Sequence, residues 1–223
     1  MITLKAIEKT YDLGQTKISA VSGIDLQINR GDFLAITGPS GSGKSTLLNI
    51  LGILDNPTKG SYLLEDYDIT MLSDKDQSRI RNKHFGFIFQ SFNLFSELSA
   101  LENVMLPMSY AKVPSKIRRE RAAQLLADVG LEQRMHHLPS MMSGGEQQRT
   151  AIARALANQP DLILADEPTG NLPTDKGEEV LRTLEMLNKR DVTIVMVTHN
   201  EEQARKAKRR IHIQDGHIVG ERT

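Results

Sequence analysis

The sequence predicts an α/β fold in which helices cover a parallel sheet, with an antiparallel β subdomain and an inserted helical subdomain. Short, uniformly apolar segments at 162–166 and 193–199 alternate with an amphipathic helical segment at 174–190. This alternation is typical of parallel strands that helices cover on both faces. A long block of helical pattern between residues 99 and 158 interrupts it, which indicates an insertion.

The 223 residues suit one large domain. We expect a single domain over residues 1–223, with a core at about 1–90 and 160–223 and a helical subdomain at about 91–159. The strands near the two chain ends are expected to be antiparallel and to flank the core.

Each element has its own local signal. The alternation of Ile2, Leu4 and Ala6 predicts that these side chains face the core. Strands are expected around residues 2–6, 24–28, 32–37, 85–90, 162–166, 193–199 and 210–221, the last as a hairpin that turns at Asp-Gly. Helices are expected around residues 45–54, 73–83, in several segments of 99–158, at 174–190 and at 200–208.

Composition limits the classes of function. Lysine plus arginine equals aspartate plus glutamate, 28 each, so the neutral chain gives no reason to expect nucleic acid as a partner. There is no cysteine, which excludes disulfides and thiolate metal sites. No stretch approaches the roughly 18 consecutive apolar residues of a membrane-spanning helix. We therefore expect a chain that is soluble, or peripheral and held to a membrane by another chain.

A phosphate-binding loop is the most specific motif. Within residues 38–46, the segment from Gly38 to Ser45 matches G-x-x-x-x-G-K-[ST] between an apolar strand and a helix, the context that separates this motif from a chance glycine-rich loop. Backbone N–H groups and the helix N-terminus attract phosphate, Lys44 suits the β- and γ-phosphates, and Ser45 suits Mg²⁺. The predicted ATP-binding residues of this loop are Gly38, Pro39, Ser40, Gly41, Ser42, Gly43, Lys44, Ser45 and Thr46.

Two adjacent carboxylates, Asp166 and Glu167, end the apolar strand at 162–166. Burying such a pair is costly unless something offsets the charge. Beside a phosphate-binding loop, Asp166 is predicted to face Mg²⁺ through water, and Glu167 to act as general base toward the attacking water. The alternative, two solvated acids at the start of a loop, is less favoured because the loop motif is present.

A second glycine pair lies within residues 141–149, where a helix is expected to begin. Ser143 by itself would be an ordinary N-cap, while Ser143, Gly144, Gly145 and Glu146 together also form an anion-binding helix start. With the phosphate-binding loop before it and the acidic pair 23 residues after Ser143, this segment resembles the signature motif of ABC-transporter ATPases. The resemblance covers essentially the whole chain and implies the ABC ATPase fold around a P-loop NTPase core.

The resemblance assigns further roles. Tyr11 matches the aromatic residue that stacks on adenine, Gln90 the glutamine loop that touches Mg²⁺ and the attacking water, and His199 the switch histidine at the γ-phosphate. The implied catalytic residues are Glu167, His199, Gln90 and Lys44. The implied metal ligands are Ser45, Gln90 and Asp166.

The resemblance also implies partners. Members of the family form a head-to-tail homodimer with two ATP molecules, each between one P-loop and the signature motif of the other subunit. Residues 38–60, 85–108 and 165–172 are most similar to the branch that powers lipoprotein release, macrolide and peptide export, and the related cell-division pair. The implied partner is a separate integral membrane permease, with a periplasmic adaptor reached through it. The implied location is cytoplasmic, peripheral on the inner face of the cell membrane.

Two positions depart from the family pattern. Met142 stands where the signature motif usually begins with leucine, a substitution that conserves volume and apolarity. Pro173 stands where the family has the D-loop aspartate, so a carboxylate and a backbone N–H are both absent. Asp175 is the candidate substitute. We expect ATP hydrolysis slower than in a member that has the aspartate.

Alternative functions stay open at the level of the sequence. An ATP-switched regulator of a membrane complex would have nearly the same sequence, and a soluble, non-transport ABC ATPase is a further alternative. A small-molecule kinase would lack the signature motif. Phe92 and Phe95, after the glutamine loop, are candidates for docking the membrane partner, and burial in the core is the equal alternative.

Overall fold

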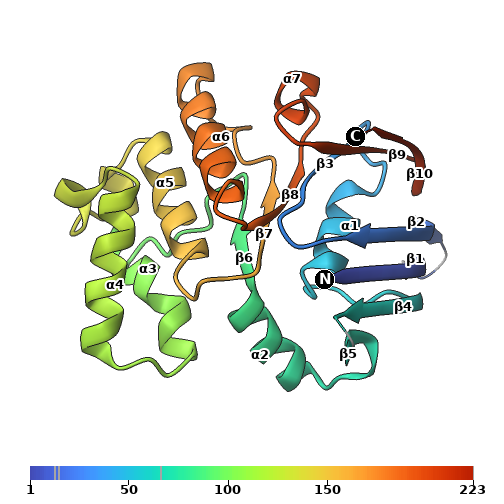
Figure 1. Cartoon of the computed structure of the whole chain (residues 1–223), viewed down its shortest axis with the longest axis horizontal. Coiled ribbons are helices and arrows are strands. Elements are labelled where there is room, and N and C mark those ends of the chain that lie inside the picture. Colours follow the sequence, from blue (N-terminus) through green and yellow to red (C-terminus); the bar gives the residue numbers. More distant parts are fainter. Residues whose placement is uncertain (13, 15, 66, 223) are drawn as a thin grey trace. The chain divides into compact units, whose positions relative to one another are not determined.

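In a computed structural model of the chain, the described residues (1–12, 14, 16–65 and 67–222) form two compact units (Figure 1). Unit 1 comprises Met1–Arg79 and Leu187–Thr223, and unit 2 comprises Ile80–Met186. Helices α2 (Asp74–His84) and α6 (Thr174–Asn188) run through the two points at which the chain passes between the units.

Unit 1 contains an antiparallel sheet, as the sequence predicts for the N-terminal strands. Its order is β2-β1-β4-β5. The bounds are β1 Ile2–Asp12, β2 Lys17–Ile28, β4 Lys59–Leu64 and β5 Tyr67–Asp68. Strands β4 and β5 are missing from the sequence prediction, although Tyr62 and Leu64 alternate as strand residues facing a core do.

The predicted alternation of β1 is right for Ile2 and Leu4, which are buried, and wrong for Ala6, which is exposed. A bulge lies between Leu4 and Ile7, and Ala6 has a φ of 47°. The extra residue reverses which side chains face inward, so Ile7 is buried instead. Gly60 of β4 accommodates the bulge, because a Cβ there would collide with the Ala6 carbonyl.

The second group of strands in unit 1 has the order β10-β9-β3-β8. Strand β3 pairs in parallel with β8 and β9, and β9 and β10 form the predicted antiparallel hairpin, which turns at Asp215 (φ 49°) and Gly216 (φ 80°). Every residue of β3 and β8 is buried, as expected of central parallel strands. The bounds are β3 Phe33–Thr37, α1 Lys44–Leu51, η1 Ile69–Met71, β8 Thr193–Val197, α7 Glu201–Ala204, β9 Arg209–Gln214 and β10 His217–Arg222.

Unit 2 joins a strand pair to a group of helices. Strands β6 and β7 pair in parallel, and Gly86 of β6 allows the close approach of Ala155 on α5. The bounds are β6 Phe85–Ile88, α3 Ala100–Tyr110, α4 Ser115–Asp128, η2 Glu132–Arg134, η3 Pro139–Met141, α5 Gly144–Ala155 and β7 Leu162–Asp166. The helices share a core of Ala100, Leu101, Val104, Met108, Ala122, Leu126, Leu131, Met142, Ala153 and Ala157.

The fold class is confirmed, with parallel strands, helices and a separate antiparallel sheet. Among the described residues, no helix combines the length and apolarity needed to cross a bilayer.

Helix α3 begins with a reciprocal capping box. The Ser99 hydroxyl accepts a hydrogen bond from the Glu102 backbone N–H, and the Glu102 carboxylate accepts from the Ser99 backbone N–H at 2.8 Å. Next to it, the buried Asn103 side chain donates to the carbonyl oxygens of Phe95 and Leu98. The loop before α3 is therefore held by side-chain bonds to its backbone, and Phe95 stays 51% exposed at its surface.

Removal of this cap tests its contribution to folding. We expect Ser99→Ala to lower the free energy of unfolding by about 1 kcal/mol, because an N-terminal N–H of α3 loses its acceptor. Urea unfolding followed by circular dichroism measures the change.

Ser115→Ala is the matched control, since Ser115 is exposed in the first turn of α4 and lies after a cap position with no side-chain bond. An equal loss of stability in both variants would contradict the assignment.

Candidate functional site

The phosphate-binding loop follows β3 in unit 1 and has a backbone that only glycine accommodates. Gly38 has a φ of 146° and Gly43 a φ of 102°. A Cβ on Gly38 would collide with the carbonyl oxygen of Ile213 in β9, and a Cβ on Gly43 with that of Ala20 in β2. The loop is thus enclosed by backbone from two distant strands, which explains glycine at both positions.

The start of α1 has hydrogen-bonding groups available for an anion. Gly43 is its N-cap and has no side chain to cap the helix. The Ser42 hydroxyl is buried and has no hydrogen-bond partner among the described residues. Lys44 is also buried, and its ammonium donates to the Pro39 carbonyl at 2.7 Å. A loop at a helix N-terminus with an unpaired buried hydroxyl and a lysine folded over it fits a polyphosphate.

His199 lies at the same edge of the sheet as this loop. The parallel register pairs Ile36 of β3 with Val197 of β8, and the Thr198 N–H donates to the Ile36 carbonyl at 3.1 Å. His199 follows directly and is exposed, and Asn200 caps α7 behind it. The register therefore brings the predicted switch histidine and the phosphate-binding loop to neighbouring strand ends.

Tyr11 lies near the end of β1 and is 36% exposed. Its hydroxyl donates to Asp55 Oδ2 at 2.8 Å, and the Lys9 ammonium lies 5.0 Å from the centre of its ring. Burial, with help from Asp55, raises the pKa of the Tyr11 hydroxyl, so Tyr11 remains a neutral donor. An aromatic ring is thus held partly open to solvent, as a base-stacking residue requires.

In unit 2, the predicted glutamine and the acidic pair lie at the ends of two neighbouring strands. The register pairs Ile88 of β6 with Ala165 of β7, so Gln90 and Asp166 come just after paired residues. Glu167 has a φ of 44°, an unusual conformation for a non-glycine residue and one typical of functional sites.

The loop after the acidic pair holds Gln90 in place. The Asn171 amide donates to the Gln90 carbonyl at 2.9 Å, and the Gln90 amide donates to Asn171 Oδ1 at 3.4 Å. A Cβ on Gly170 would meet the Gln90 amide at 2.7 Å. Gln90 and the segment after Glu167 therefore cannot move independently.

Ser143 is the N-cap of α5, as the sequence indicates. Its hydroxyl accepts from the Glu146 N–H, and Glu146 Oε2 accepts from the Ser143 N–H at 2.8 Å. This backbone hydrogen bond, aided by the nearby guanidinium groups of Arg134 and Arg149, outweighs burial and lowers the pKa of Glu146. The N-terminus of α5 therefore has an ionised carboxylate, that of Glu146, bonded to its backbone.

The signature glycines lie against the segment that follows the acidic pair. A Cβ on Gly144 would be 3.4 Å from Leu172 and 3.6 Å from Phe92, and a Cβ on Gly145 would be 3.5 Å from the stem of Lys176. Phe92 is half-buried here, so of the two phenylalanines only Phe95 is exposed. The glycines leave room for these three side chains.

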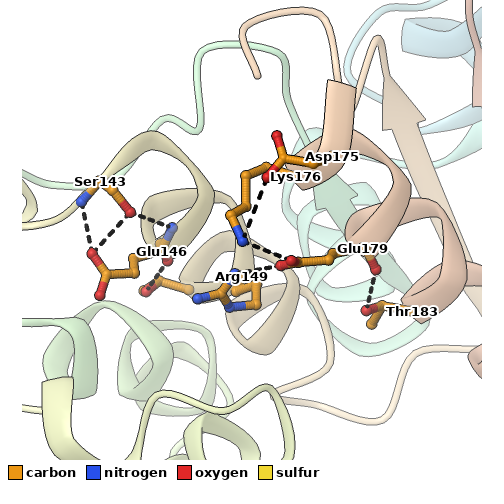
Figure 2. Close-up of polar contacts among 8 residues, drawn as sticks. Ser143, Glu146, Arg149, Asp175, Lys176, Glu179 and Thr183 are labelled. Atoms are coloured by element: carbon orange, nitrogen blue, oxygen red, sulfur yellow. Dashed lines mark hydrogen bonds and ion pairs between the residues drawn. The ribbon is translucent and has the colours of Figure 1, made fainter. Parts of the chain in front are cut away.

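A charged cluster joins α5 to the start of α6 (Figure 2). Glu179 accepts from Lys176 at 2.7 Å and from Arg149 of α5 at 3.3 Å. The hydrogen bond from Lys176 lowers the pKa of Glu179 and in turn raises that of Lys176. The cluster links the signature helix to the helix that begins beside Pro173.

Pro173 immediately precedes α6, and its carbonyl accepts a hydrogen bond from the Gly177 N–H in the first turn of the helix at 2.9 Å. Proline suits this position, where its missing N–H has no helical partner. The Asp175 carboxylate is 71% exposed and lies 3.8 Å from the Lys176 ammonium. The candidate substitute for the missing aspartate thus has a cation beside it.

Sequence reasoning missed four residues that hold the predicted ones. These are Lys9, Asp55, Asn171 and Lys176. The signals for them are weak: Lys9 is two residues before Tyr11 on one strand face, and Asp55 directly follows the helix predicted at residues 45–54. Asn171 and Lys176 had no signal apart from their nearness to Glu167 and Pro173.

Comparison with known proteins identifies the family. The family described as ABC transporter matches residues 21–170. An uncharacterized ABC transporter ATP-binding protein of Thermotoga maritima is 51% identical over 220 residues, covering 99% of this chain and 94% of that protein. The macrolide export ATP-binding/permease protein MacB of Bdellovibrio bacteriovorus is 48% identical over 98% of this chain, which corresponds to 33% of MacB.

Solved structures agree with the fold. A dimeric post-hydrolysis state of the ATP-binding cassette MJ0796, bound to ADP and Pi, has a TM-score of 0.93 and 43% identity, covering 100% of this chain and 98% of that one. A second dimeric structure of MJ0796, described as a bacterial ABC transporter cassette, has a TM-score of 0.93 and 44% identity. The chain therefore belongs to the ABC transporter family and is an ATP-binding, ATP-hydrolysing domain of it.

Proposed function

We propose that this chain binds Mg-ATP, closes head-to-tail on a second copy around two nucleotides, and drives a separate membrane permease in extrusion. The observation that carries the proposal is the phosphate-binding loop, whose glycines, unpaired Ser42 hydroxyl and folded Lys44 fit a polyphosphate. ATP hydrolysis supplies the energy for extrusion, and the charged phosphates of the bound ATP attract the two subunits to each other.

The proposed roles in unit 1 concern nucleotide binding. Tyr11 stacks on adenine, and the loop residues hold the phosphates, with Lys44 neutralising the β- and γ-phosphates. His199 contacts the γ-phosphate. Its position just after β8, the strand that pairs with β3 before the loop, supports this role.

The proposed roles in unit 2 concern hydrolysis. Glu167 accepts a proton from the attacking water, and Gln90 orients that water. The left-handed backbone of Glu167 and the bonds between Gln90 and Asn171 support the view that both side chains are pre-positioned.

The proposed metal ligands are Ser45, Asp166 and Gln90, with Asp166 acting through water. Hydroxyl, carboxylate and amide oxygens are the donors that Mg²⁺ prefers. The described residues include no cluster of three or more histidine, aspartate or glutamate ligands. This agrees with an ion that takes most of its ligands from phosphate and water.

The proposed dimer places the start of α5, with Ser143, Gly144 and Gly145, against the nucleotide of the other subunit. The structures of MJ0796, which are dimeric, support the formation of a dimer. A helix N-terminus attracts phosphate. In this chain Glu146 already lies at that terminus, so we propose that nucleotide engagement competes with its capping box.

The proposed membrane partner is a separate permease that this chain meets on the cytoplasmic face. The name of MacB, which joins an ATP-binding part and a permease, supports an export role. We propose that Phe95, exposed on a loop that Asn103 holds rigid, contributes to docking.

Co-purification tests the partner. The tagged Glu167→Gln form is extracted from native membranes with ATP in mild detergent, and bound proteins are identified by mass spectrometry. We expect a membrane protein with few spanning helices and a large extracytoplasmic domain. A membrane-free dimer would contradict the proposal and favour a soluble ATPase. Recovery of a permease whose cargo does not move in vesicles would favour an ATP-switched regulator.

Glu167→Gln tests the chemistry. We expect ATP turnover to fall about 10²- to 10⁴-fold with ATP binding retained, because a general base contributes about that much. Phosphate release measures turnover, and light scattering with ATP measures the dimer, which this variant should accumulate.

Glu178→Gln is the control, since Glu178 is an exposed carboxylate paired with Arg182 on α6. Unchanged ATP turnover in Glu167→Gln would show that Glu167 is not the general base.

Pro173→Asp tests the departure from the family pattern. We expect turnover per site to rise about three- to tenfold, since a charge-assisted hydrogen bond is worth roughly 1.5–3 kcal/mol before the cost of ordering. Steady-state kinetics measure the rate and its cooperativity.

Two controls separate the backbone from the carboxylate. Pro173→Ala removes the ring without adding an acid and should leave the rate low, and Asp175→Asn should change little because Asp175 is solvent-exposed and beside Lys176. A rise with Pro173→Ala, or none with Pro173→Asp, would show that the missing carboxylate does not limit turnover.

A further inference from the structure

Tyr11 lies in a polar network that the adenine-stacking role does not require. The Lys9 ammonium donates to Asp55 Oδ1 at 2.5 Å and to the Asn56 carbonyl at 2.8 Å. The Tyr11 hydroxyl donates to the other Asp55 oxygen at 2.8 Å. The Asp55 carboxylate, which is distant from β1 in sequence, thus accepts hydrogen bonds from two side chains of β1.

The network holds both the face and the edge of the ring. The Lys9 ammonium, 5.0 Å from the ring centre, occupies one face as a cation–π partner, and the hydroxyl is bonded at the edge. Tyr11 is 36% exposed, so part of its ring remains accessible to a base. Lys9 and Asp55 are only 13% and 28% exposed, so water screens their attraction less than at an open surface.

Asp55 keeps its charge in this position. Burial raises the pKa of its carboxyl, but the hydrogen bonds from Lys9 and Tyr11 outweigh that effect and hold the pKa below its usual value. The acceptor is therefore ionised at neutral pH, and hydrogen bonds to an ionised acceptor are the stronger kind.

The position of Asp55 is set by the helix that follows the phosphate-binding loop. Helix α1 ends at Leu51, before the predicted residue 54, and the Leu54 N–H returns to the Asn49 carbonyl at 2.8 Å. Ile53 has a φ of 56°, an outlier for a β-branched residue, and its side chain is only 2% exposed. Packing thus holds the turn that presents Asp55.

We propose that Lys9 and Asp55 are positioning residues for the nucleotide base: they fix the Tyr11 ring relative to α1, so that a triphosphate in the loop and a base on the ring fit together. This rests on the proposed function and deepens it. The chemistry implied is a purine or similar flat ring linked to a triphosphate. Neither residue takes part in phosphate binding.

Calorimetric titration with two ligands separates this role from a plain structural tether. Mg-ATP has both base and phosphates, while Mg-tripolyphosphate has no base. We expect Lys9→Met and Asp55→Asn each to weaken Mg-ATP binding about three- to fivefold and Tyr11→Ala about tenfold, within the range that base–aromatic stacking provides. Binding of Mg-tripolyphosphate should be unchanged in all three variants.

A double-mutant cycle gives the second readout. In a Tyr11→Ala background, Lys9→Met and Asp55→Asn should have no further effect on Mg-ATP binding, because they act through the ring. Lys59→Met is the matched control, since Lys59 forms an exposed pair with Glu8 at 3.0 Å on the same sheet.

Three results would overturn the proposal. The first is an equal loss of affinity for Mg-ATP and Mg-tripolyphosphate in the Lys9 and Asp55 variants. The second is that these substitutions weaken Mg-ATP binding as much in the Tyr11→Ala background as in the unmodified chain. The third is that the single variants bind Mg-ATP with unchanged affinity. If the unmodified chain binds no Mg-ATP, and Lys44→Ala changes nothing, the proposed function itself fails along with the inference.

Discussion

Enclosure of the phosphate-binding loop by backbone is the constraint on which the rest of unit 1 depends. Gly38 and Gly43 have no space for a Cβ, because carbonyls of Ile213 and Ala20 lie against them. Holding those carbonyls there requires β9 beside β3 and β2 close to the loop. The turn at Gly216 completes this, as its N–H donates to the Ser42 carbonyl at 3.0 Å. Buried parallel strands thus hold the loop at the N-terminus of α1, the end of a helix that attracts phosphate.

Polar groups concentrate where parallel strands end, for an electrostatic reason. Backbone groups there leave the sheet, and helices begin with unpaired N–H donors. In unit 1 this edge has the loop and His199, and in unit 2 it has Gln90 and the acidic pair. The two carboxylates at the end of β7, Asp166 and Glu167, are half-buried, which limits the cost of placing them beside one another.

The start of α5 differs from the start of α1 in how its donors are satisfied. Helix α1 has no side-chain cap, whereas Glu146 and Ser143 cap α5 reciprocally. Ionic contacts of Glu179 then tie α5 to the beginning of α6. The two helix starts therefore differ in charge, because the first turn of α5 has an acidic residue and that of α1 has none.

The sequence by itself determined the loop, the acidic pair and most helices and strands, because each depends on spacing within a few residues. The Asp-Gly hairpin and the Ser143 cap are of this kind. Tertiary structure alone decided the bulge that turns Ala6 outward, and the contact of Lys9 with Asp55 across 46 residues. These arise where distant segments meet, and no local pattern specifies which side chains a fold will bring within hydrogen-bonding distance.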